Sequence, residues 1–403
     1  MIKTINIDNN IEKIAISSEE NNIDDFIFKN FMSLKEVIIL SSINKIRANC
    51  FEGCSSLREI TIPSSVKSID DYAFSGCSSI INIIIPSLVT EIGNYAFNRC
   101  NSLISISIPS SVKKIGKYAF NCCSSLLEIS INSNINEIDD YTFYNCKSLI
   151  NVEIPNSVNN IGNYAFSGCR SLESITLPST VLSIGEYIFE RCTSLKIFTF
   201  KTSIIKRIGA GSFSNCTSLK KIEIPNSIKI IEENTFKNCL SLEEIRIPES
   251  VGVIGEKAFS GCSSLTEIEI PKLVVLIKNG TFSNCTSLKK ITIYSSIAKI
   301  EDYAFYKCVS LSKIELSKTW LEEIGNYAFF GCKSLTKLKF PIDLKRIGDF
   351  AFKNCSSLDI ISIPKYFLYA GKDCVEGCAL LATDIKEELI DLHRYPKRIF
   401  YNF

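Results

Sequence analysis

Residues 57–79, LREITIPSSVKSIDDYAFSGCSS, decide the fold because the same pattern returns at a fixed spacing along almost the whole chain. Leu57, Ile60 and Ile62 alternate with polar residues, which is typical of a short strand with one buried face. Pro63 ends this strand, because proline fixes φ and has no N–H to give to a ladder. The stretch therefore predicts a coil that opens with a strand and then turns back.

The second half of the stretch supplies more inward-facing residues. Val66 and Ile69 turn towards the core again, and Phe74 and Cys77 fill the back of the coil. Cysteine recurs in this last position every 23 residues, with two steps of 24, at positions 54, 77, 100, 123, 146, 169, 192, 216, 239, 262, 285, 308, 332, 355 and 378. A period of this length indicates a solenoid, in which each unit packs only on its neighbours.

Sixteen coils are expected. Fifteen begin regularly between Leu34 and Leu358, and we assign the start of a sixteenth to Ile2, Ile5 and Ile7, followed by a nine-residue insertion around residues 17–22. The two 24-residue coils gain their extra residue near Ile205 and near Leu321, and both have lost the proline that ends the strand.

The chain is accordingly expected to have three parts. Residues 1–33 form a divergent N-terminal coil and cap with the insertion, residues 34–378 form the repeat array, and residues 379–403 form a C-terminal helical cap. Thr383 is the expected N-cap of that helix. Its apolar side is formed by Ile385, Leu389 and Leu392.

The repeat, with segments such as GNYAFSGC at residues 162–169, resembles the BspA-like family of leucine-rich repeats, the 23-residue class. The resemblance covers about residues 1–378. It implies a leucine-rich-repeat solenoid, a curved superhelix with a parallel β-sheet on its concave face. It also implies a cell-surface protein that adheres to host or matrix proteins, since most members of the family are associated with that role.

Three recurring side chains are interpreted as scaffold. Equivalent residues of stacked coils point in parallel, so the phased cysteines should be buried and unpaired, with Cys122 the most exposed thiol. The serine two residues after each cysteine is expected to satisfy a backbone group through its hydroxyl. The third column is expected to be a stack of aromatic rings, formed by Tyr72, Tyr95, Tyr118, Tyr141, Tyr164 and Tyr187, and then by Tyr303, Tyr327 and Phe350.

Composition argues against catalysis and against several partners. The single histidine, His393, lies beyond the array, so no imidazole is expected beside a nucleophile there. No phosphate-binding loop, metal site or cofactor is predicted. The net charge is +2 from 45 basic and 43 acidic residues, which gives no reason to expect nucleic acid or a membrane surface as partner. No apolar run is long enough to span a bilayer.

Binding information must therefore lie at strand positions that face outwards. In the middle coils these positions hold short, mostly neutral side chains with two carboxylates. This candidate site on the concave face comprises Ser105, Ser107, Glu128, Ser130, Asn151, Glu153, Ser174 and Thr176. From residue 221 onwards the same positions are mostly charged, and many of these charges are expected to pair between coils, as Lys221 with Glu244, Glu223 with Arg246 and Glu267 with Lys290.

The function predicted is non-enzymatic binding of a protein partner by a monomeric chain. A surface adhesion protein is one alternative, from the resemblance. An intracellular scaffold is the other, because the chain opens without a secretory signal and its eighteen cysteines are typical of a reducing compartment.

Overall fold

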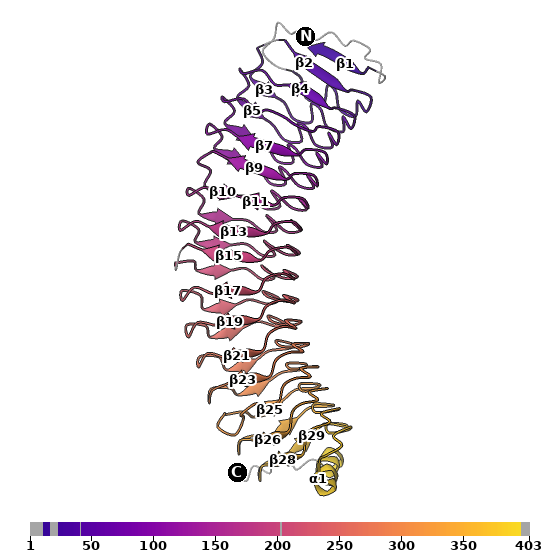
Figure 1. Ribbon diagram of the computed structural model, residues 1–403, viewed down its shortest axis with the longest axis vertical. Helices are drawn as coiled ribbons and strands as arrows, with labels where there is room; N and C mark the ends of the chain where they lie inside the picture. The colour runs from indigo at the N-terminus through magenta and orange to yellow at the C-terminus, as the bar shows by residue number, and fades with distance from the viewer. Residues whose placement is uncertain (1–10, 17–22, 41, 202–203, 396–403) are drawn as a thin grey trace, which may run out of the picture. The chain divides into compact units, whose positions relative to one another are not determined.

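A computed structural model describes residues 11–16, 23–40, 42–201 and 204–395. The chain divides into two compact units, Met1–Ile204 and Ile205–Phe403. In each unit, parallel strands from successive coils lie side by side (Figure 1), so the predicted repeat solenoid with a parallel sheet is confirmed. The boundary between the units falls at the first of the two 24-residue coils.

Coils of the first unit contain two strands, which we call the front strand and the return strand. The front strand follows the recurring leucine, and the return strand follows the valine. The front strands are β1 (Lys13–Ile16), β2 (Glu36–Ile39), β4 (Glu59–Thr61), β7 (Ser105–Ile108), β9 (Glu128–Ile131), β11 (Asn151–Val152), β13 (Ser174–Leu177) and β15 (Ile197–Phe200). The return strands are β3 (Lys45–Ile46), β5 (Ser68–Ile69), β6 (Glu91–Ile92), β8 (Lys114–Ile115), β10 (Glu137–Ile138), β12 (Asn160–Ile161) and β14 (Ser183–Ile184).

The second unit repeats this arrangement and ends in a helix. Its front strands are β17 (Lys221–Glu223), β19 (Glu244–Arg246), β21 (Glu267–Glu269), β23 (Lys290–Thr292), β26 (Lys337–Lys339) and β28 (Ile360–Ser362). Its return strands are β16 (Arg207–Ile208), β18 (Ile230–Ile231), β20 (Val253–Ile254), β22 (Leu276–Ile277), β24 (Lys299–Ile300), β25 (Glu323–Ile324), β27 (Arg346–Ile347) and β29 (Tyr369–Ala370). The helix is α1 (Thr383–Arg394).

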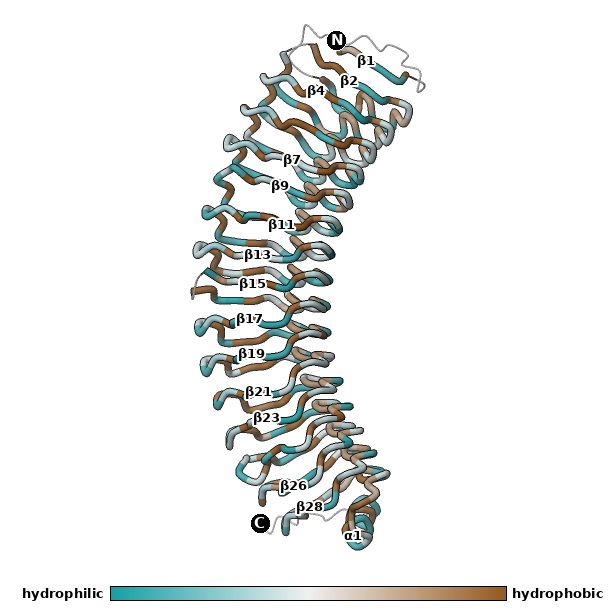
Figure 2. Tube along the Cα trace, in the orientation of Figure 1, coloured by the Kyte–Doolittle hydropathy of each residue, from teal (hydrophilic) through white to brown (hydrophobic). Residues whose placement is uncertain are grey.

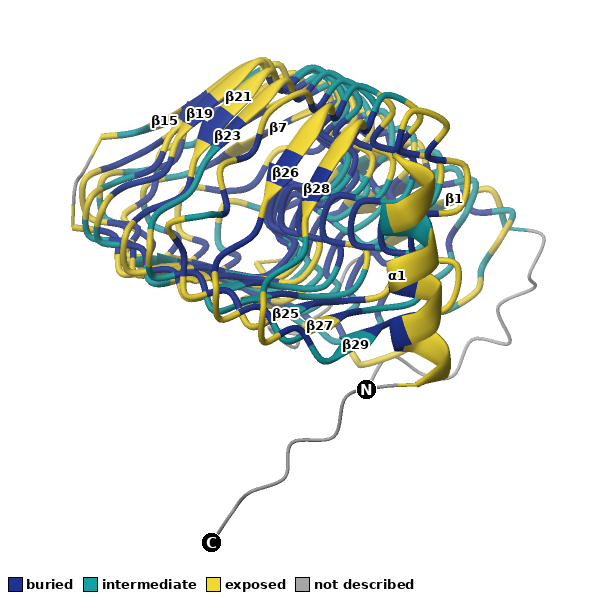
Figure 3. Cartoon of the chain, turned by 90° about the horizontal axis from the view of Figure 1, so that it is seen from below, coloured by how far each residue is buried: buried dark blue, intermediate teal, exposed yellow. Residues whose placement is uncertain are grey.

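Strand pairing keeps equivalent residues in columns. Ser105 lies opposite Glu128, and Ile106 lies opposite Ile129, at the spacing of one repeat. Hydrophobic segments recur coil after coil along the chain (Figure 2). In β19 and β21 an exposed residue, a buried one and an exposed one follow each other (Figure 3), as alternation in a half-buried strand requires.

The start of the first coil was predicted wrongly. Strand β1 pairs with β2 with Lys13 opposite Glu36, so Ile14 occupies the position of Val37. The regular 23-residue spacing therefore reaches back to Ile11, so the expected insertion is not needed to bring the first strand into register; residues 17–22, where it was placed, lie outside the described residues. The error arose because Ile2, Ile5 and Ile7 fit the same local pattern, whereas only strand register fixes the phase. Those three residues lie outside the described part of the chain.

Phenylalanine forms the centre of the core. In the first unit the rings at positions 28 to 189 stack from coil to coil, and Phe143 lies 5.6 Å from Phe120 and 5.3 Å from Phe166 between ring centroids. In the second unit a like stack begins with Phe213 on Phe236 at 5.5 Å. These rings are fully buried, so each coil contributes a large apolar group to a core that grows in one dimension.

The recurring cysteines have a polar role that the sequence did not reveal. These thiols donate hydrogen bonds to the carbonyl of the phenylalanine one coil back, as from Cys77 Sγ to Phe51 O at 3.0 Å and from Cys262 Sγ to Phe236 O at 3.2 Å. Burial raises the pKa of Cys378 to about 11 and that of Cys285 to about 12. The column therefore holds protonated thiols that satisfy buried carbonyl groups.

Native protein should react with a thiol reagent at few positions, and at Cys122 first, because that thiol is half-buried while the other seventeen are buried. A buried, protonated thiol is a poor nucleophile. Mass spectrometry after alkylation, before and after unfolding, measures the number of reactive positions. Several intramolecular disulfides in the native protein would contradict this account.

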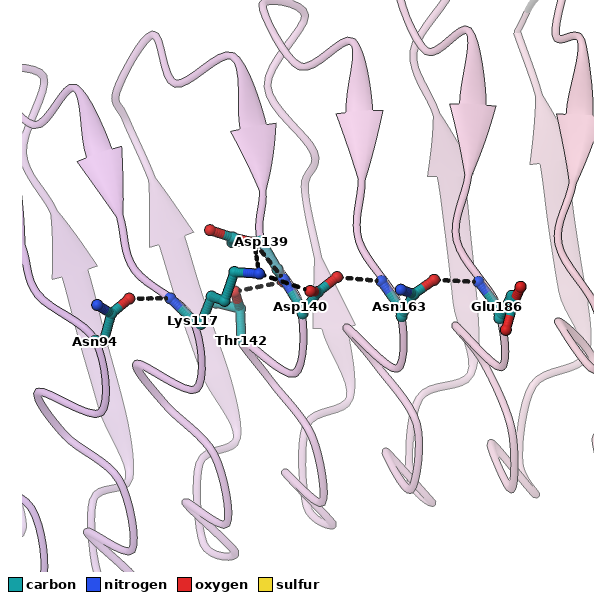
Figure 4. A network of polar contacts seen from close by, with 7 residues as sticks. All are labelled: Asn94, Lys117, Asp139, Asp140, Thr142, Asn163 and Glu186. Atoms are coloured by element: carbon teal, nitrogen blue, oxygen red, sulfur yellow. Dashed lines mark hydrogen bonds and ion pairs between the residues drawn. The ribbon is translucent and has the colours of Figure 1, made fainter.

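A polar spine connects the coils just after the return strands. In the first unit Asp140 Oδ1 accepts a hydrogen bond from the backbone N–H of Asn163 at 2.8 Å, and Asn163 Oδ1 accepts one from Glu186 at 2.8 Å (Figure 4). Lys117 reaches the same site, where its Nζ lies 2.9 Å from Asp140 Oδ2. The adjacent carboxylates of Asp139 and Asp140 therefore fix the geometry of the turn and take part in ion pairs.

Each turn also contains residues in the left-handed backbone region, which the sequence analysis did not anticipate. The tyrosine position has positive φ, for example 58° at Tyr118, and so does the residue before the cysteine, for example 61° at Cys122. Glycine and asparagine tolerate this region best. Both residue types accordingly recur at these positions in the other coils, as at Gly53 and Asn145.

The serine column was interpreted wrongly in part. The hydroxyl groups that bond to carbonyl groups belong to other positions, chiefly the one before the recurring valine, as from Ser111 Oγ to Val89 O at 2.6 Å. At the predicted position it is the backbone that bonds, as from Ser102 N to Ser78 O at 3.1 Å. Serine there is thus a turn residue whose N–H joins the coils.

Helix α1 packs on β29, the last return strand, through its buried side chains Leu389 and Leu392. His393 Nδ1 lies 3.2 Å from the carbonyl oxygen of Ala370 in that strand. The N-cap is Ala382, which makes no side-chain cap bond, so the prediction of Thr383 as N-cap is wrong by one position. Among the described residues, no helix has the length and apolarity that crossing a membrane requires.

Candidate functional site

The outward side chains of the front strands form a surface that we call the strand face. In the first unit it contains all eight residues of the predicted site, and seven of them are exposed, while Ser174 is half-buried. The inward neighbours of these residues, such as Ile106 and Ile129, are buried in the core. The structure therefore presents the predicted side chains to solvent on one face.

Strand register arranges these residues in two parallel columns. Strands β7, β9 and β11 are neighbours in one sheet, with Ser105 opposite Glu128 and Glu128 opposite Asn151. The second column places Ser107 opposite Ser130. Hydroxyl groups in this column take part in local bonds, since Asn132 Nδ2 donates to Ser107 Oγ at 3.2 Å. The side chains of the two columns are polar and mostly short, so the backbone of a partner can approach the strands closely.

A third column, missed by the sequence analysis, runs beside these two. The residue one place after the recurring leucine position is aliphatic in four successive coils and exposed by 39–45%: Ile81, before the bridge residue Asn82, and Ile104, Leu127 and Ile150, before β7, β9 and β11. We call these four residues the apolar column. Arg58 precedes it and Glu173 follows it at the same position, so charged residues bound it at both ends. The signal that could have revealed it is the 23-residue spacing of aliphatic residues one place after the buried leucine.

The backbone fixes the apolar column in place. The N–H of Ile104 donates to the carbonyl oxygen of Ile81 at 3.0 Å, and the N–H of Leu127 donates to that of Ile104 at 2.8 Å. A contiguous exposed apolar stripe with a polar border is typical of a protein-binding surface.

Two carboxylates on the same face, Glu128 and Glu153, make no ion pair within the described residues. On the same face Glu36 is paired with Lys13 at 2.6 Å, whereas Glu59 likewise makes no ion pair within the described residues. The strand face of the first unit therefore combines an apolar column, a row of hydroxyl groups and the unpaired carboxylates of Glu59, Glu128 and Glu153, of which the last two lie within the predicted site.

The tyrosine column lies in the turns and not on this face. Its rings stack closely, with centroids 4.5 Å apart for Tyr95 and Tyr118 and for Tyr118 and Tyr141. Burial and the neighbouring tyrosines raise the pKa of Tyr118 to about 12. Because ring faces within the stack are covered by other rings, this column is scaffold, as predicted.

In the second unit the strand face is charged, and the expected pairing is observed in part: Glu223 and Arg246 lie opposite each other in the register but form no ion pair among the described residues. Lys221 Nζ lies 2.7 Å from Glu244 Oε1, and Lys290 Nζ lies 3.8 Å from Glu267 Oε2. Within the described ranges, no three His, Cys, Asp or Glu side chains are grouped so as to hold a metal ion.

Comparison with protein families gives a match to the BspA type leucine-rich repeat region over residues 2–127, 113–232, 196–311 and 275–402. The chain is similar to a crystal structure of a leucine-rich repeat protein from Bacteroides ovatus ATCC 8483, with 30% identity and a TM-score of 0.62 over 87% of this chain and 92% of that chain. It is also similar to one from Eubacterium ventriosum ATCC 27560, with 24% identity and a TM-score of 0.51 over 76% of this chain and 84% of that chain. No curated protein matches it.

Proposed function

Because the chain belongs to the BspA-type leucine-rich repeat family, we propose that it binds a protein partner through the strand face of its first unit. The family and the fold support a protein-interaction role for the repeats, and proteins of this family are generally binding proteins without enzymatic activity. The observation that carries the proposal is the apolar column beside the eight polar residues of the predicted site.

The chemistry of this face defines the partner. Covering Ile104, Leu127 and Ile150 removes apolar surface from water, which stabilises a complex by about 25 cal/mol per Å². The hydroxyl groups of the neighbouring column can meet backbone groups of the partner. Glu128 and Glu153 favour a basic group opposite them. The partner is therefore a protein segment with apolar side chains and at least one Lys or Arg.

Changes on the strand face should weaken binding and leave the fold intact. We expect Ser105→Arg, Glu128→Lys, Glu153→Lys and Thr176→Arg together to reduce affinity for the partner by at least about tenfold, since central interface residues commonly contribute more than about 1 kcal/mol each. A partner captured from cell or matrix extract would be titrated against each variant. Circular dichroism checks the fold, because single surface changes usually alter stability by about 0.5 kcal/mol or less.

A matched variant separates the strand face from the turns. Tyr118, Tyr141 and Tyr164 lie in the same coils, and their replacement should leave affinity unchanged as long as the fold survives. If the tyrosine changes abolish binding while the strand-face changes do not, the contact lies on the turns, and the proposal fails.

Two settings are proposed for this binding, both with a monomeric chain. Adhesion at a cell surface is favoured by the family resemblance. An intracellular scaffold is favoured by the cysteine column, whose thiols are held as hydrogen-bond donors and would be suited to a reducing compartment. Antibody labelling of intact cells compared with permeabilised cells distinguishes them, since only a surface protein is labelled on intact cells.

A further inference from the structure

The second unit carries an exposed tryptophan in a fixed turn. Trp320, the chain's one tryptophan, is 65% exposed and lies in the second 24-residue coil, where Ser317 replaces the proline that usually ends the front strand. The residues on either side of it, Thr319 and Leu321, are buried. Its backbone N–H donates to the carbonyl oxygen of Ser295 in the preceding coil at 3.0 Å. The extra residue of this coil therefore holds an indole ring outwards.

The next two coils present large apolar groups at the same turns. Ile342 is 62% exposed and Tyr366 is 60% exposed, and both follow the strand-ending proline of their coils. In the first unit this turn begins with a small polar residue, as at Ser110 and Ser179, and Leu88 is a single exposed aliphatic residue there, without an aromatic neighbour. Tryptophan and tyrosine are the residues most enriched at the centres of protein interfaces.

Beside these turns, the strand face carries lysines without ion-pair partners. Lys313, Lys337 and Lys339 point outwards, and no carboxylate in the described part of the chain lies within 4.0 Å of them. This differs from Lys221 in the same unit, which is paired with Glu244 at 2.7 Å.

The acidic groups of these coils do not neutralise the lysines. Glu315 accepts a hydrogen bond from Ser317 Oγ at 2.5 Å, and this bond, more than its attraction to Lys313, lowers the pKa of its carboxyl group. Asp343 and Asp359 are exposed and likewise make no ion pair among the described residues. The strand face of these coils therefore carries three lysines and one glutamate, and its net charge is positive.

We infer that Trp320, Ile342 and Tyr366, together with Lys313, Lys337 and Lys339, form a second docking surface that binds an acidic protein segment carrying apolar side chains. We call these six residues the second surface. The inference goes beyond the proposed function, since it concerns other residues, the other unit and a partner of opposite charge.

The arrangement favours a protein over a polyanion of another class. Ile342 and Ile360, which lies opposite Lys337, are exposed aliphatic side chains that a sulfated polysaccharide or a nucleic acid would leave uncovered. Lys337 and Lys339 are two residues apart on one strand, so their side chains are separated by roughly 7 Å along it. Carboxylates at alternate positions of an extended segment have the same separation.

The order of residues along the strand defines a probe. The strand runs from the lysines towards the turn, so a segment that lies parallel to it should carry two carboxylates two residues apart, followed by apolar residues. We would use a fluorescein-labelled decapeptide with two Glu at that spacing and two Leu after them, in a background of Gly and Ser. Control peptides replace both Glu by Gln, or both Leu by Ser.

Saturable binding of the Glu-Leu peptide to the full chain should move the emission of Trp320 to shorter wavelength as the indole leaves water. Both control peptides and the variant Lys337→Gln with Lys339→Gln should bind at least about tenfold more weakly by anisotropy. Trp320→Ser, followed by anisotropy, should weaken binding in the same way. The matched variant Lys220→Gln with Lys221→Gln removes two paired lysines of the same unit and should bind as the parent does.

Three results would overturn the inference: no saturable binding of the peptide, equal binding of its Leu-to-Ser control, or equal binding of a sulfated polysaccharide or a single-stranded oligonucleotide. The last result would assign the lysines to polyanions in general. The strand-face variants of the first unit should leave peptide binding unchanged, so failure here is distinguishable from failure of the proposed function.

Discussion

Phe143→Ala should lower the free energy of unfolding by about 3–5 kcal/mol, as large-to-small changes of buried aromatic residues do. Phe143 is fully buried and stacks on a ring from each neighbouring coil, at 5.6 and 5.3 Å. We expect a loss of stability near the upper end of this range, because the neighbouring coils cannot move closer together to fill the cavity that the ring leaves. Their separation is held by ladder bonds such as that from Phe143 N to Ala165 O at 2.8 Å.

Denaturant unfolding followed by circular dichroism measures this change. Glu128→Gln in the same coil is the control, since it alters only an exposed side chain and should shift stability by about 0.5 kcal/mol or less. A loss below about 1 kcal/mol for Phe143→Ala would mean that the aromatic stack is not the main support of the coil.

Removal of residues 379–403 should have the second large effect, a loss of about 3–6 kcal/mol from the burial of Leu389 and Leu392 on the last coil. The exposed end of a solenoid presents core side chains and unpaired strand edges, so the truncated chain should aggregate or unfold from its C-terminal coils. Size-exclusion chromatography and thermal unfolding measure both outcomes.

Two further variants show whether α1 acts as a cap. Leu389→Asp with Leu392→Asp keeps the chain length and should reproduce the effect of truncation. Deletion of residues 126–148, one whole coil, should be tolerated better because every remaining interface is of the same kind. A truncated chain that stays monomeric with an unchanged melting profile would show that the helix is not a cap.

The repeat could be read from the sequence because its signals reinforce each other in coil after coil. The spacing of Leu57, Ile60 and Ile62 predicted the front strand, and the 23-residue period predicted columns of like residues, which the register confirms. The phase of the first coil could not be predicted in the same way. Isoleucine is so frequent near the N-terminus that two frames fit, and only the pairing of Lys13 with Glu36 decides between them.

Backbone conformation explains why the tyrosine column is interrupted, which the pattern of hydrophobic side chains leaves unexplained. In the second unit Gly211, Asn234 and Gly280 stand where half of the coils have tyrosine, and all three have positive φ, as does Lys257 between them. Tyrosine in this region is strained, and stacking on neighbouring rings offsets that strain. The position thus alternates between residues that tolerate the turn and residues that stack, a choice that depends on φ and is invisible in a hydrophobic pattern.

The candidate site was predicted in part for a related reason. The outward positions of β7, β9, β11 and β13 follow from strand alternation, so their residues could be named in advance. The apolar column lies just before the strands, where alternation does not apply, and only the structure shows Ile104 and its equivalents to be exposed. Trp320 was hidden in the same way, inside an insertion with no repeat partner.

Hydroxyl-radical footprinting of the full chain, free and bound to its partner, tests the central claim most directly. Aliphatic and aromatic side chains both react, so the strand face and the turns of the same coils are compared in one measurement. The account predicts reduced labelling of Ile104, Leu127 and Ile150 in the complex, with Tyr118 and Tyr141 unchanged. Protection of the tyrosines, with full labelling of the apolar column, would contradict it.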